Sequence, residues 1–273
     1  MRIAIFPNYS RENTAPVCEK VRAVLSAYGA ETVEVPLADD TGEAIAGADL
    51  SIAVGGDGTA IRCARLSAPY GKPTLGINAG RVGYICELEQ SEIQRLSGLF
   101  SGQYAIEKRM MLKATVSRGG KILREFSALN DIVLSRGTLS RMIDFEVSAA
   151  GGAPCRYRAD GLIFATPTGS TAYSYSAGGP VVDPALSCIL LTPVCAHTPT
   201  GARSLVFSAS ETLYLKAPQE SETQLYLTAD GAENFAMEPG DLLKIVKDEK
   251  TADFIRLKDR NFYTLFNEKL MKG

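Results

Sequence analysis

Residues 50–59 read LSIAVGGDGT, an apolar run followed by three glycines that surround one carboxylate. The run Leu50–Val54 predicts a buried strand, and Thr59–Leu66 predicts the helix after it. Glycines in such a turn can adopt positive φ and leave backbone N–H groups bare, so that amides converge on an anion at the helix N-terminus. The stretch therefore predicts a phosphate site on an α/β sheet.

Asp57 is out of place in a plain anion cradle, because a carboxylate repels phosphate. We expect it to face a metal, a sugar hydroxyl or a proton to be removed. The alternative is an ordinary strand-to-helix turn, in which Asp and Gly are common residues and short glycine motifs recur by chance.

The first hundred residues alternate short strands with helices, which predicts a parallel sheet with helices on its faces. The expected strands are 3–6, 32–37, 50–54 and 74–78, and the expected helices are 17–28, 59–66 and 91–100. Ligands of such sheets bind beyond the carboxyl ends of the strands. GGDGT and the loop NAGRVGY at 78–84 both fall there.

The pattern then changes to closely spaced strands, which predicts a β sandwich. These strands are expected at 114–117, 122–126, 132–134, 142–147, 204–208, 212–216, 224–228 and 242–246. We therefore predict an α/β domain over 1–100 and a β-rich domain over 101–254. The C-terminal segment 255–273 is predicted to be a helix, clearest over 260–270, that packs back on the first domain.

Composition narrows the class of protein. The 273 residues are 45% apolar and carry a net charge of −2, which gives no electrostatic footprint for nucleic acid or a membrane surface. Six scattered cysteines, without a CxxC pair and with one histidine, argue against a zinc site or a disulfide framework, and we expect reduced, mostly buried thiols. No signal-peptide core or bilayer-length apolar run stands out, so we expect a cytoplasmic protein.

A second unusual stretch, DGLIFATPTGSTAYSYSAGGP, occupies residues 160–180. The hydroxyls of Thr166, Thr168, Ser170 and Thr171 suit ribose and phosphate oxygens, and Tyr173 offers a flat face. A Ser/Thr/Gly-rich surface loop is the alternative interpretation. The pair Asn130 and Asp131 fits either a ribose contact or a turn.

Neither a GxxxxGK[ST] loop nor a GxGxxG turn is present, which excludes the usual P-loop and dinucleotide-fold fingerprints. The chain instead resembles the ATP or polyphosphate NAD kinases, which phosphorylate the adenosine 2′-hydroxyl of NAD. The likeness lies in GGDGT at 55–59, GINAGRVGY at 76–84, ND at 130–131, the 160–180 stretch and TPVCAH at 192–197. GGDGT alone is shared with lipid kinases and is similar to a phosphofructokinase loop, whereas the 160–180 stretch singles out NAD kinase.

The resemblance implies a Rossmann-like or phosphofructokinase-like first domain, an all-β second domain, and a homodimer or homotetramer whose NAD site borrows residues from a neighbouring subunit. It implies that Asp57 is the general base, that Gly58 and Thr59 line the phosphate path, that Arg62 meets phosphate and that Tyr84 stacks near the adenine. It implies further NAD contacts from these residues: Asn130, Asp131, Arg141, Arg158, Asp160, Thr171, Ala172, Tyr173, Ser174, Tyr175 and Ser176.

Three positions depart from the family pattern: Asp131 replaces the usual Glu, Ala196 a common Pro and Ala232 a Gln contact. Asp131 shortens its ligand-facing arm by one methylene. A divalent ion, expected to be Mg²⁺ held mainly by donor phosphates, would neutralise the transferring group without a protein metal cage. The donor, ATP or polyphosphate, stays open.

Two other classes are weighed against this one. A lipid kinase would share GGDGT but present an apolar entry for an acyl chain, whereas the stretch after Asp160 is rich in hydroxyls. A non-catalytic NAD(H)-binding sensor would keep the ribose contacts without needing Asp57.

Overall fold

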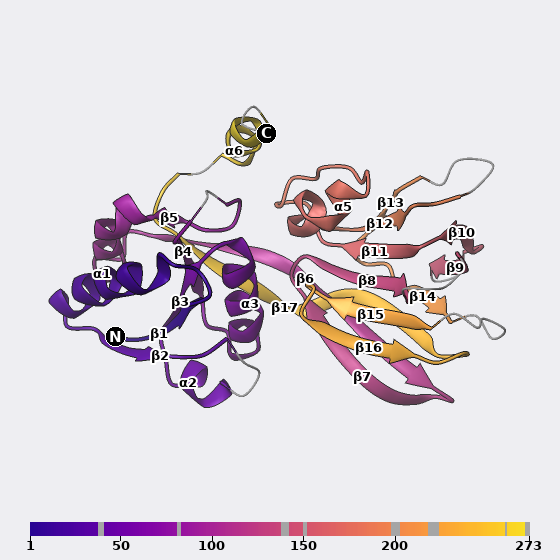
Figure 1. Cartoon of the computed structure of the whole chain (residues 1–273), viewed down its shortest axis with the longest axis horizontal. Coiled ribbons are helices and arrows are strands. Elements are labelled where there is room, and N and C mark those ends of the chain that lie inside the picture. The colour runs from indigo at the N-terminus through magenta and orange to yellow at the C-terminus, as the bar shows by residue number, and fades with distance from the viewer. Residues whose placement is uncertain are drawn as a thin grey trace. The chain divides into compact units, whose positions relative to one another are not determined.

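The computed structural model describes residues 1–37, 41–80, 83–137, 142–149, 152–197, 203–217, 224–259 and 261–270. It divides into two compact units (Figure 1): unit 1 comprises Met1–Arg109 and Lys250–Gly273, and unit 2 comprises Met110–Glu249. No helix in the described ranges has the length and apolar character to cross a membrane.

Unit 1 contains a parallel sheet in the order β17-β4-β3-β1-β2, and β5 also pairs with β4. Its elements are β1 (Arg2–Pro7), α1 (Thr14–Ala27), β2 (Glu31–Glu34), α2 (Gly42–Ala46), β3 (Leu50–Gly55), α3 (Asp57–Ser67), η1 (Ala68–Tyr70), β4 (Thr74–Asn78), β5 (Leu88–Glu89), η2 (Gln90–Ser97), α4 (Gly98–Ser101), the start of β6 (Ala105–Arg118), the end of β17 (Leu242–Arg256), and α6 (Phe262–Leu270).

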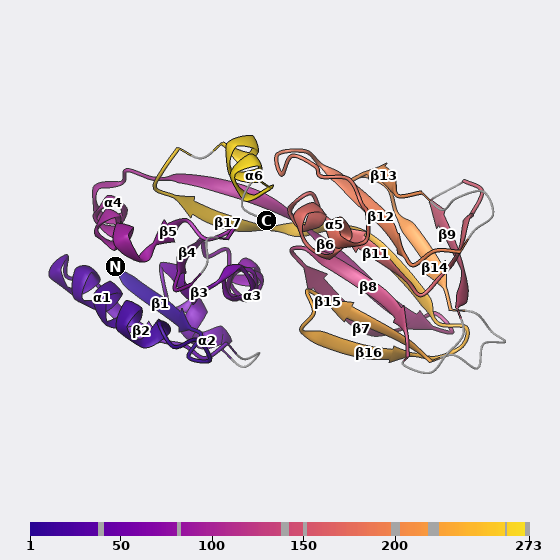
Figure 2. The same ribbon diagram turned by 45° about the horizontal axis from the view of Figure 1, so that its top comes forward.

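The two faces of the unit 1 sheet are covered by different helices, α1 on one side and α3 on the other (Figure 2). Alternate residues of β3 explain the difference, because successive side chains of a strand point to opposite faces. Leu50, Ile52 and Val54 join the core that contains α1. On the α3 side the strand is lined by small residues, and Ser51 Oγ accepts a hydrogen bond of 2.8 Å from Ser67 Oγ. Small residues there allow α3 to lie close to the sheet.

Unit 2 is a sandwich of antiparallel sheets, as the strand spacing predicts. One sheet has the order β13-β12-β11-β8-β15-β16, and the other contains β10, β9, β14, β17, β6 and β7. The remaining bounds are β7 (Lys121–Ala128), β8 (Asp131–Arg136), β9 (Ile143–Ala149), β10 (Cys155–Ala159), β11 (Gly161–Ala165), η3 (Thr168–Thr171), α5 (Tyr173–Ser176), β12 (Cys188–Val194), β13 (Leu205–Ser208), β14 (Leu213–Lys216), β15 (Leu225–Ala229) and β16 (Glu233–Met237). One core joins both sheets, with Phe126 and Phe145 from one and Phe164 and Leu191 from the other.

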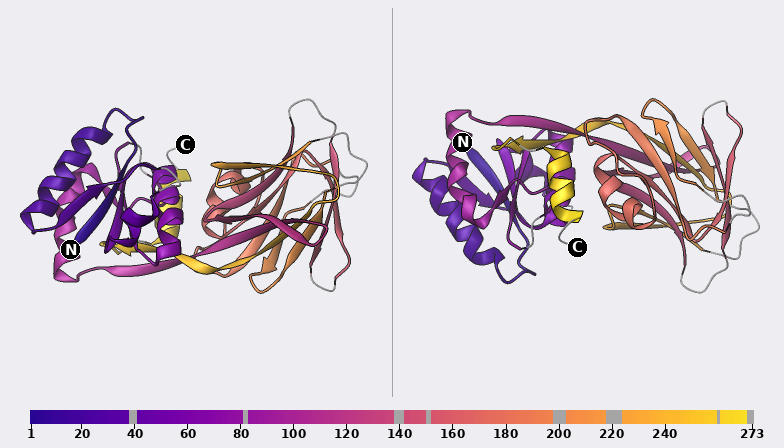
Figure 3. Two further views of the ribbon diagram at one scale, coloured as in Figure 1. Left: turned by 90° about the horizontal axis from the view of Figure 1, so that it is seen from below. Right: turned by 90° about the horizontal axis from the view of Figure 1, so that it is seen from above.

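Two long strands, β6 and β17, carry the chain from unit 1 into unit 2 and back (Figure 3). Unit 2 is therefore inserted into unit 1, and residues after Lys250 return to complete the first sheet. There Phe254 of β17 pairs with Thr74 of β4.

Two helix predictions need correction. The segment predicted as helix over 91–100 is a 3₁₀ helix, η2, followed by the short α4, and its buried residues Ile93, Leu96 and Leu99 recur every three positions, which is the 3₁₀ period. The C-terminal helix α6 is Phe262–Leu270, because residues 255–256 still belong to strand β17.

Candidate active site

The GGDGT turn connects β3 to α3 in unit 1. A side-chain carbon at Gly55 would lie 2.8 Å from Thr59 Cβ, so only glycine fits there. The Thr59 hydroxyl accepts hydrogen bonds from Asn8 Nδ2 at 3.0 Å and from the Gly56 backbone N–H at 3.4 Å. This hydroxyl is only slightly exposed and stabilises the turn.

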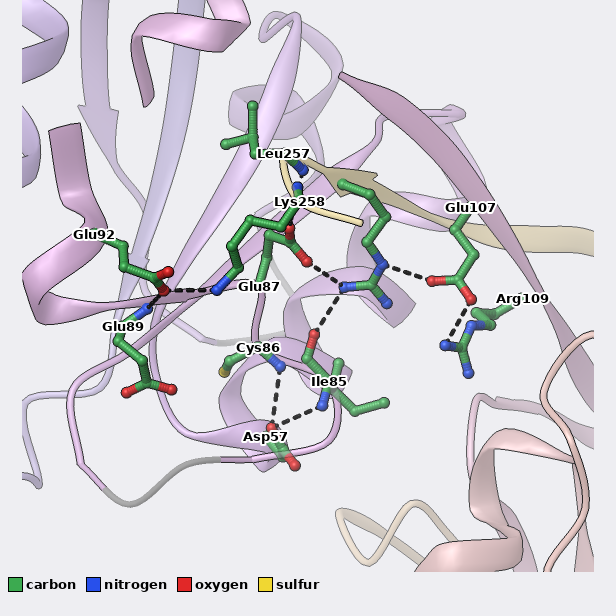
Figure 4. Close-up of polar contacts among 11 residues, drawn as sticks. Asp57, Ile85, Cys86, Glu87, Glu89, Glu92, Glu107, Arg109, Leu257 and Lys258 are labelled. Atoms are coloured by element: carbon green, nitrogen blue, oxygen red, sulfur yellow. Dashed lines mark hydrogen bonds and ion pairs between the residues drawn. The ribbon is translucent and has the colours of Figure 1, made fainter. Parts of the chain in front are cut away.

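Asp57 is the first residue of α3, and its carboxylate is held by the backbone of a distant loop (Figure 4). Oδ1 accepts hydrogen bonds of 3.1 Å from the N–H groups of Ile85 and Cys86. Oδ2 accepts one from the N–H group of Tyr84. Three backbone donors therefore fix the carboxylate that the sequence singles out, while the side chain stays half-buried.

Arg11 lies beside the same turn, and sequence reasoning missed it. A side-chain carbon at Gly56 would lie 3.1 Å from Arg11 Nη2, and one at Gly80 would lie 3.0 Å from Nη1. Gly56 and Gly80 follow neighbouring strands β3 and β4, and Arg11 follows β1. The turns after three strands thus bring an exposed guanidinium against bare glycine backbone.

The other predicted residues of unit 1 occupy different positions. Gly58 is exposed, and no atom lies within 4 Å of where its Cβ would be. Arg62 is half-buried further along α3. Helical spacing sends its side chain to a different face from that of Asp57. The ring of Tyr84 lies 6.5 Å from that of Phe266 in α6.

In unit 2, Asp230 holds the Asn130 and Asp131 pair in place. Its carboxylate accepts hydrogen bonds from the N–H groups of Leu129 at 2.9 Å, Asn130 at 2.8 Å and Asp131 at 3.1 Å. Asp230 itself has φ of 48°. Asn130 Oδ1 is buried and accepts no described hydrogen bond, which is costly unless a ligand supplies a donor.

Asp131 begins β8 and is 6% exposed. Burial, and secondly the nearby charge of Asp230, raise the pKa of the Asp131 carboxyl to about 7. This side chain can therefore change its protonation near neutral pH, and a ligand that donates to it would favour its ionised form.

Several hydroxyls of the 160–180 stretch serve the fold, contrary to the expectation that they face ribose and phosphate. Thr166 Oγ1 donates to Leu129 O at 2.6 Å and accepts from the Gly169 N–H at 3.1 Å. Ser170 Oγ donates to Pro167 O at 2.7 Å and accepts from the Val182 N–H at 3.0 Å. The structure uses these hydroxyls to shape the turn after β11.

The predicted binding run 171–176 has two kinds of side chain. Ser174 is buried and its hydroxyl lies 2.9 Å from Thr192 Oγ1. Tyr173, Tyr175 and Ser176 are exposed, while Thr171 and Ala172 are half-buried where η3 meets α5. A side-chain carbon at Gly169 would lie 2.6 Å from Asn130 C, so this glycine lets the turn lie against Asn130.

Arg158 belongs to strand β10, and Asp160 lies between β10 and β11. Asp160 accepts two hydrogen bonds from Arg136, from Nε at 2.7 Å and Nη2 at 3.3 Å. Arg158 is exposed and lines a cavity of about 480 Å³ with Arg156, Tyr157, His197 and three residues of β9, Asp144, Phe145 and Glu146. The predicted contact Arg141 lies outside the described residues.

Two further predictions concern the cysteines and metal binding. All six cysteines are free thiols. Four of them are buried, which agrees with the prediction of mostly buried thiols, while Cys195 is exposed. Within the described ranges no group of three or more His, Cys, Asp or Glu side chains could hold a metal ion.

Two domain families match this chain, one mainly in the first part of unit 1 and the other mainly in unit 2. Residues 19–104 match the ATP-NAD kinase N-terminal domain, and residues 129–257 match the ATP-NAD kinase C-terminal domain. An NAD kinase from Symbiobacterium thermophilum is 45% identical over 235 residues, which cover 86% of this chain and 82% of that protein. An NAD kinase from Natranaerobius thermophilus is 37% identical over 285 residues, covering 99% and 98%.

Two solved structures are similar to this chain over nearly its whole length. The NAD kinase from Archaeoglobus fulgidus in complex with ATP is similar with a TM-score of 0.79 and 28% identity, covering 98% of each chain. The yeast NADH kinase complexed with NADH has a TM-score of 0.87 at 21% identity, covers all of this chain and 87% of the other, and shows the shared fold.

Proposed function

The chain belongs to the NAD kinase family, and from that premise we propose that it transfers the terminal phosphoryl group of ATP to the adenosine 2′-hydroxyl of NAD, with Asp57 as the general base. It is an enzyme that phosphorylates NAD to NADP with ATP. One observation supports the role of Asp57 as the base: three backbone N–H groups fix its carboxylate at the GGDGT turn.

The hydrogen bonds that the Asp57 carboxylate already accepts leave room for about one further hydrogen-bond donor. A carboxylate offers about four lone-pair sites. Oδ1 accepts two described hydrogen bonds and Oδ2 accepts one, so roughly one site remains, on Oδ2. A hydroxyl that donates there would be oriented by a carboxylate whose other sites are fixed. An aspartate is a weak base toward an alcohol, so we expect it to help mainly once the oxygen has begun bonding to phosphorus.

Asn130 and Asp131 are the unit 2 residues that we propose first as NAD contacts, because Asp230 holds the backbone of both. The buried Asn130 Oδ1 suits the N–H donor of an amide or an adenine, and the Asp131 carboxyl suits ribose hydroxyls. The rings of Tyr173 and Tyr175 are exposed, and flat aromatic faces of this kind suit stacking on a base. Thr171, Ala172, Ser174 and Ser176 belong to the same turn, and Arg158, Asp160 and Arg141 stay as predicted contacts.

Arg11 joins Gly58 and Arg62 in the proposed binding of the donor. Its guanidinium lies beside bare backbone at Gly56, next to the N-terminal N–H groups of α3. Phosphate oxygens favour such a combination of cation and backbone donors. A divalent ion, Mg²⁺ by our proposal, would bind mainly through the donor phosphates and neutralise their charge. Polyphosphate as an alternative donor is part of the same proposal.

We also propose a homo-oligomer, a dimer or tetramer. Unit 2 exposes large apolar side chains, among them Leu186 at 58% and Val206 at 56%. Contiguous exposed apolar patches mark sites where proteins associate, and both side chains lie on or next to the paired strands β12 and β13. Light scattering on the purified protein would report the mass, and a monomer at working concentration would contradict the proposal.

The experiment measures NADP formation by the purified chain with NAD, Mg²⁺ and either ATP or polyphosphate, through an NADP-specific dehydrogenase. We expect Asp57→Asn to lower kcat by about 100-fold or more while the Kd for NAD changes less than about threefold. Asp49→Asn, an exposed carboxylate of the same unit, is the matched control and should retain activity. Equal losses of turnover and NAD affinity would make Asp57 a binding residue rather than the base.

A further inference from the structure

Arg256 ends strand β17, and its guanidinium donates hydrogen bonds to three groups of unit 1. Nε donates to Glu107 Oε2 at 2.6 Å, and Nη1 donates to Glu87 Oε2 at 3.2 Å. Nη1 also donates to the backbone carbonyl oxygen of Ile85 at 3.1 Å. The Arg256 side chain is 10% exposed, so these contacts lie in a region of low dielectric where they are strong.

The Ile85 carbonyl connects Arg256 to Asp57 through one peptide group. The carbonyl of Ile85 and the N–H of Cys86 belong to the same planar unit, and in a trans peptide they point in opposite directions. Arg256 donates a hydrogen bond to the carbonyl oxygen of this peptide group. The N–H of the same group, which belongs to Cys86, donates to Asp57 Oδ1 at 3.1 Å. A cation at the carbonyl polarises the peptide and makes its N–H a stronger donor, because hydrogen bonds in a chain reinforce one another.

Arg256 is itself fixed by Glu87, whose side chain is fully buried. Glu87 Oε1 accepts hydrogen bonds of 2.9 Å from the backbone N–H groups of Leu257 and Lys258. Movement of Arg256 would take a cation away from a buried carboxylate, which is strongly unfavourable. On the other side Glu107 also pairs with Arg109 Nη2 at 2.7 Å. The guanidinium is therefore held from both ends.

We propose that Arg256 is a positioning residue for phosphoryl transfer, which acts on Asp57 through the Ile85–Cys86 peptide group. It holds the peptide group whose Cys86 N–H donates to Asp57 Oδ1, and so helps to fix the carboxylate whose remaining Oδ2 lone pair would receive the substrate hydroxyl. This inference rests on the proposed role of Asp57 as the base. Neither the sequence motifs nor the family match single out Arg256.

The test is a double-mutant cycle on kcat with Arg256→Lys and Asp57→Asn. Lysine keeps the charge, but a single ammonium group cannot reach Glu107, Glu87 and the Ile85 carbonyl as the guanidinium fork does. We expect Arg256→Lys to lower kcat about 10-fold in the wild-type background, with KM for NAD and ATP within about threefold. In the Asp57→Asn background the same change should alter kcat less than about twofold, because the group it positions is gone. Single-turnover assays with labelled ATP give the sensitivity needed.

Arg118→Lys is the matched control. Arg118 also holds two carboxylates, Asp241 through Nε at 2.7 Å and Glu238 through Nη1 at 2.6 Å, and it belongs to unit 2. Its replacement should change thermal stability without coupling to Asp57. Glu107→Gln is the second variant, because it releases Arg256 on one side without removing it. We expect a smaller loss of kcat that is again absent in the Asp57→Asn background.

An equal loss of kcat in both backgrounds, for both variants, would overturn the inference and make Arg256 a purely structural residue. Failure of the proposed base appears separately, since Asp57→Asn alone would then lower NAD affinity as much as turnover. Coupling between Arg256 and Asp57 with unchanged KM values supports the inference.

Discussion

Gly83 lies directly against the carboxylate of Asp57, so that a side-chain carbon at position 83 would overlap Oδ1 and lie 2.5 Å from Oδ2. The glycine belongs to the NAGRVGY loop, and its lack of a side chain is what allows the following N–H groups to reach the carboxylate. The loop and the GGDGT turn are therefore parts of one site.

Gly83→Ala should displace Asp57 from its backbone donors. We expect kcat to fall about 100-fold, because small misplacements of a reacting group have effects of this size. Overpacking should also lower the free energy of unfolding by about 1–3 kcal/mol. Steady-state kinetics and thermal unfolding check both results.

Gly58→Ala is the control for that substitution, because an added carbon there meets open space. Its stability should equal or exceed that of the wild type. A raised KM for ATP with unchanged stability would indicate that the donor approaches the backbone at Gly58. Equal losses of stability in Gly58→Ala and Gly83→Ala would contradict a specific role for the Gly83 contact.

Arg11→Gln should weaken binding of the donor. The loss of one charge-assisted hydrogen bond to phosphate, about 1.5–3 kcal/mol, corresponds to a rise of roughly 10- to 150-fold in the Kd for ATP. Affinity for NAD should change little. Calorimetric titrations of ATP and NAD check this, with Lys20→Gln on the exposed face of α1 as the control. Unchanged ATP binding would exclude Arg11 from the donor site.

Gly169→Ala should disrupt the proposed NAD contact at Asn130, because the added carbon would strike the backbone of that residue. We expect NAD affinity to fall at least about 10-fold, with a loss of stability of about 1–3 kcal/mol. At Gly152 the nearest neighbour, Ala149 O, is 3.8 Å away, so Gly152→Ala should be tolerated. Similar NAD affinities in the two variants would count against a role for the Asn130 turn.

Asp131→Asn should change how stability depends on pH. The pKa of this carboxyl is about 7 in the folded protein, raised by burial and by the charge of Asp230, and about 4 when unfolded. Folding therefore favours the protonated form, and the wild type loses stability as pH rises between these values. The unfolding free energy of the variant relative to the wild type should rise by roughly 3 kcal/mol from pH 5 to pH 8. Urea denaturation at both pH values measures it, and parallel curves would refute the assignment.

Local patterns predicted the strand-to-helix turn at GGDGT, and the structure confirms strand β4 at 74–78. They also placed Asp57 correctly just beyond the carboxyl end of a strand in a parallel sheet. Strand alternation and helical period depend on neighbours in the sequence, so these features can be read from short windows.

The contacts that hold the site could not be read in this way. Asp57 is bound by the backbone of residues 84–86, and Asn130 by Asp230, a hundred positions later. Arg11 follows β1 in a loop whose letters carry no phosphate signal, and its position depends on the alignment of three strands. Pairings this distant arise only from tertiary folding.

The insertion of unit 2 between the two parts of unit 1 sets an order of events during translation. A nascent chain emerges N-terminus first, so GGDGT leaves the ribosome long before Arg256 and the end of β17 are made. A chain that stalls before residue 250 carries the GGDGT turn but lacks the second half of β17, which ends in Arg256. The backbone donors of the Asp57 carboxylate are therefore made early, whereas the Arg256 contact to the Ile85 carbonyl forms only after all of unit 2 has been synthesised.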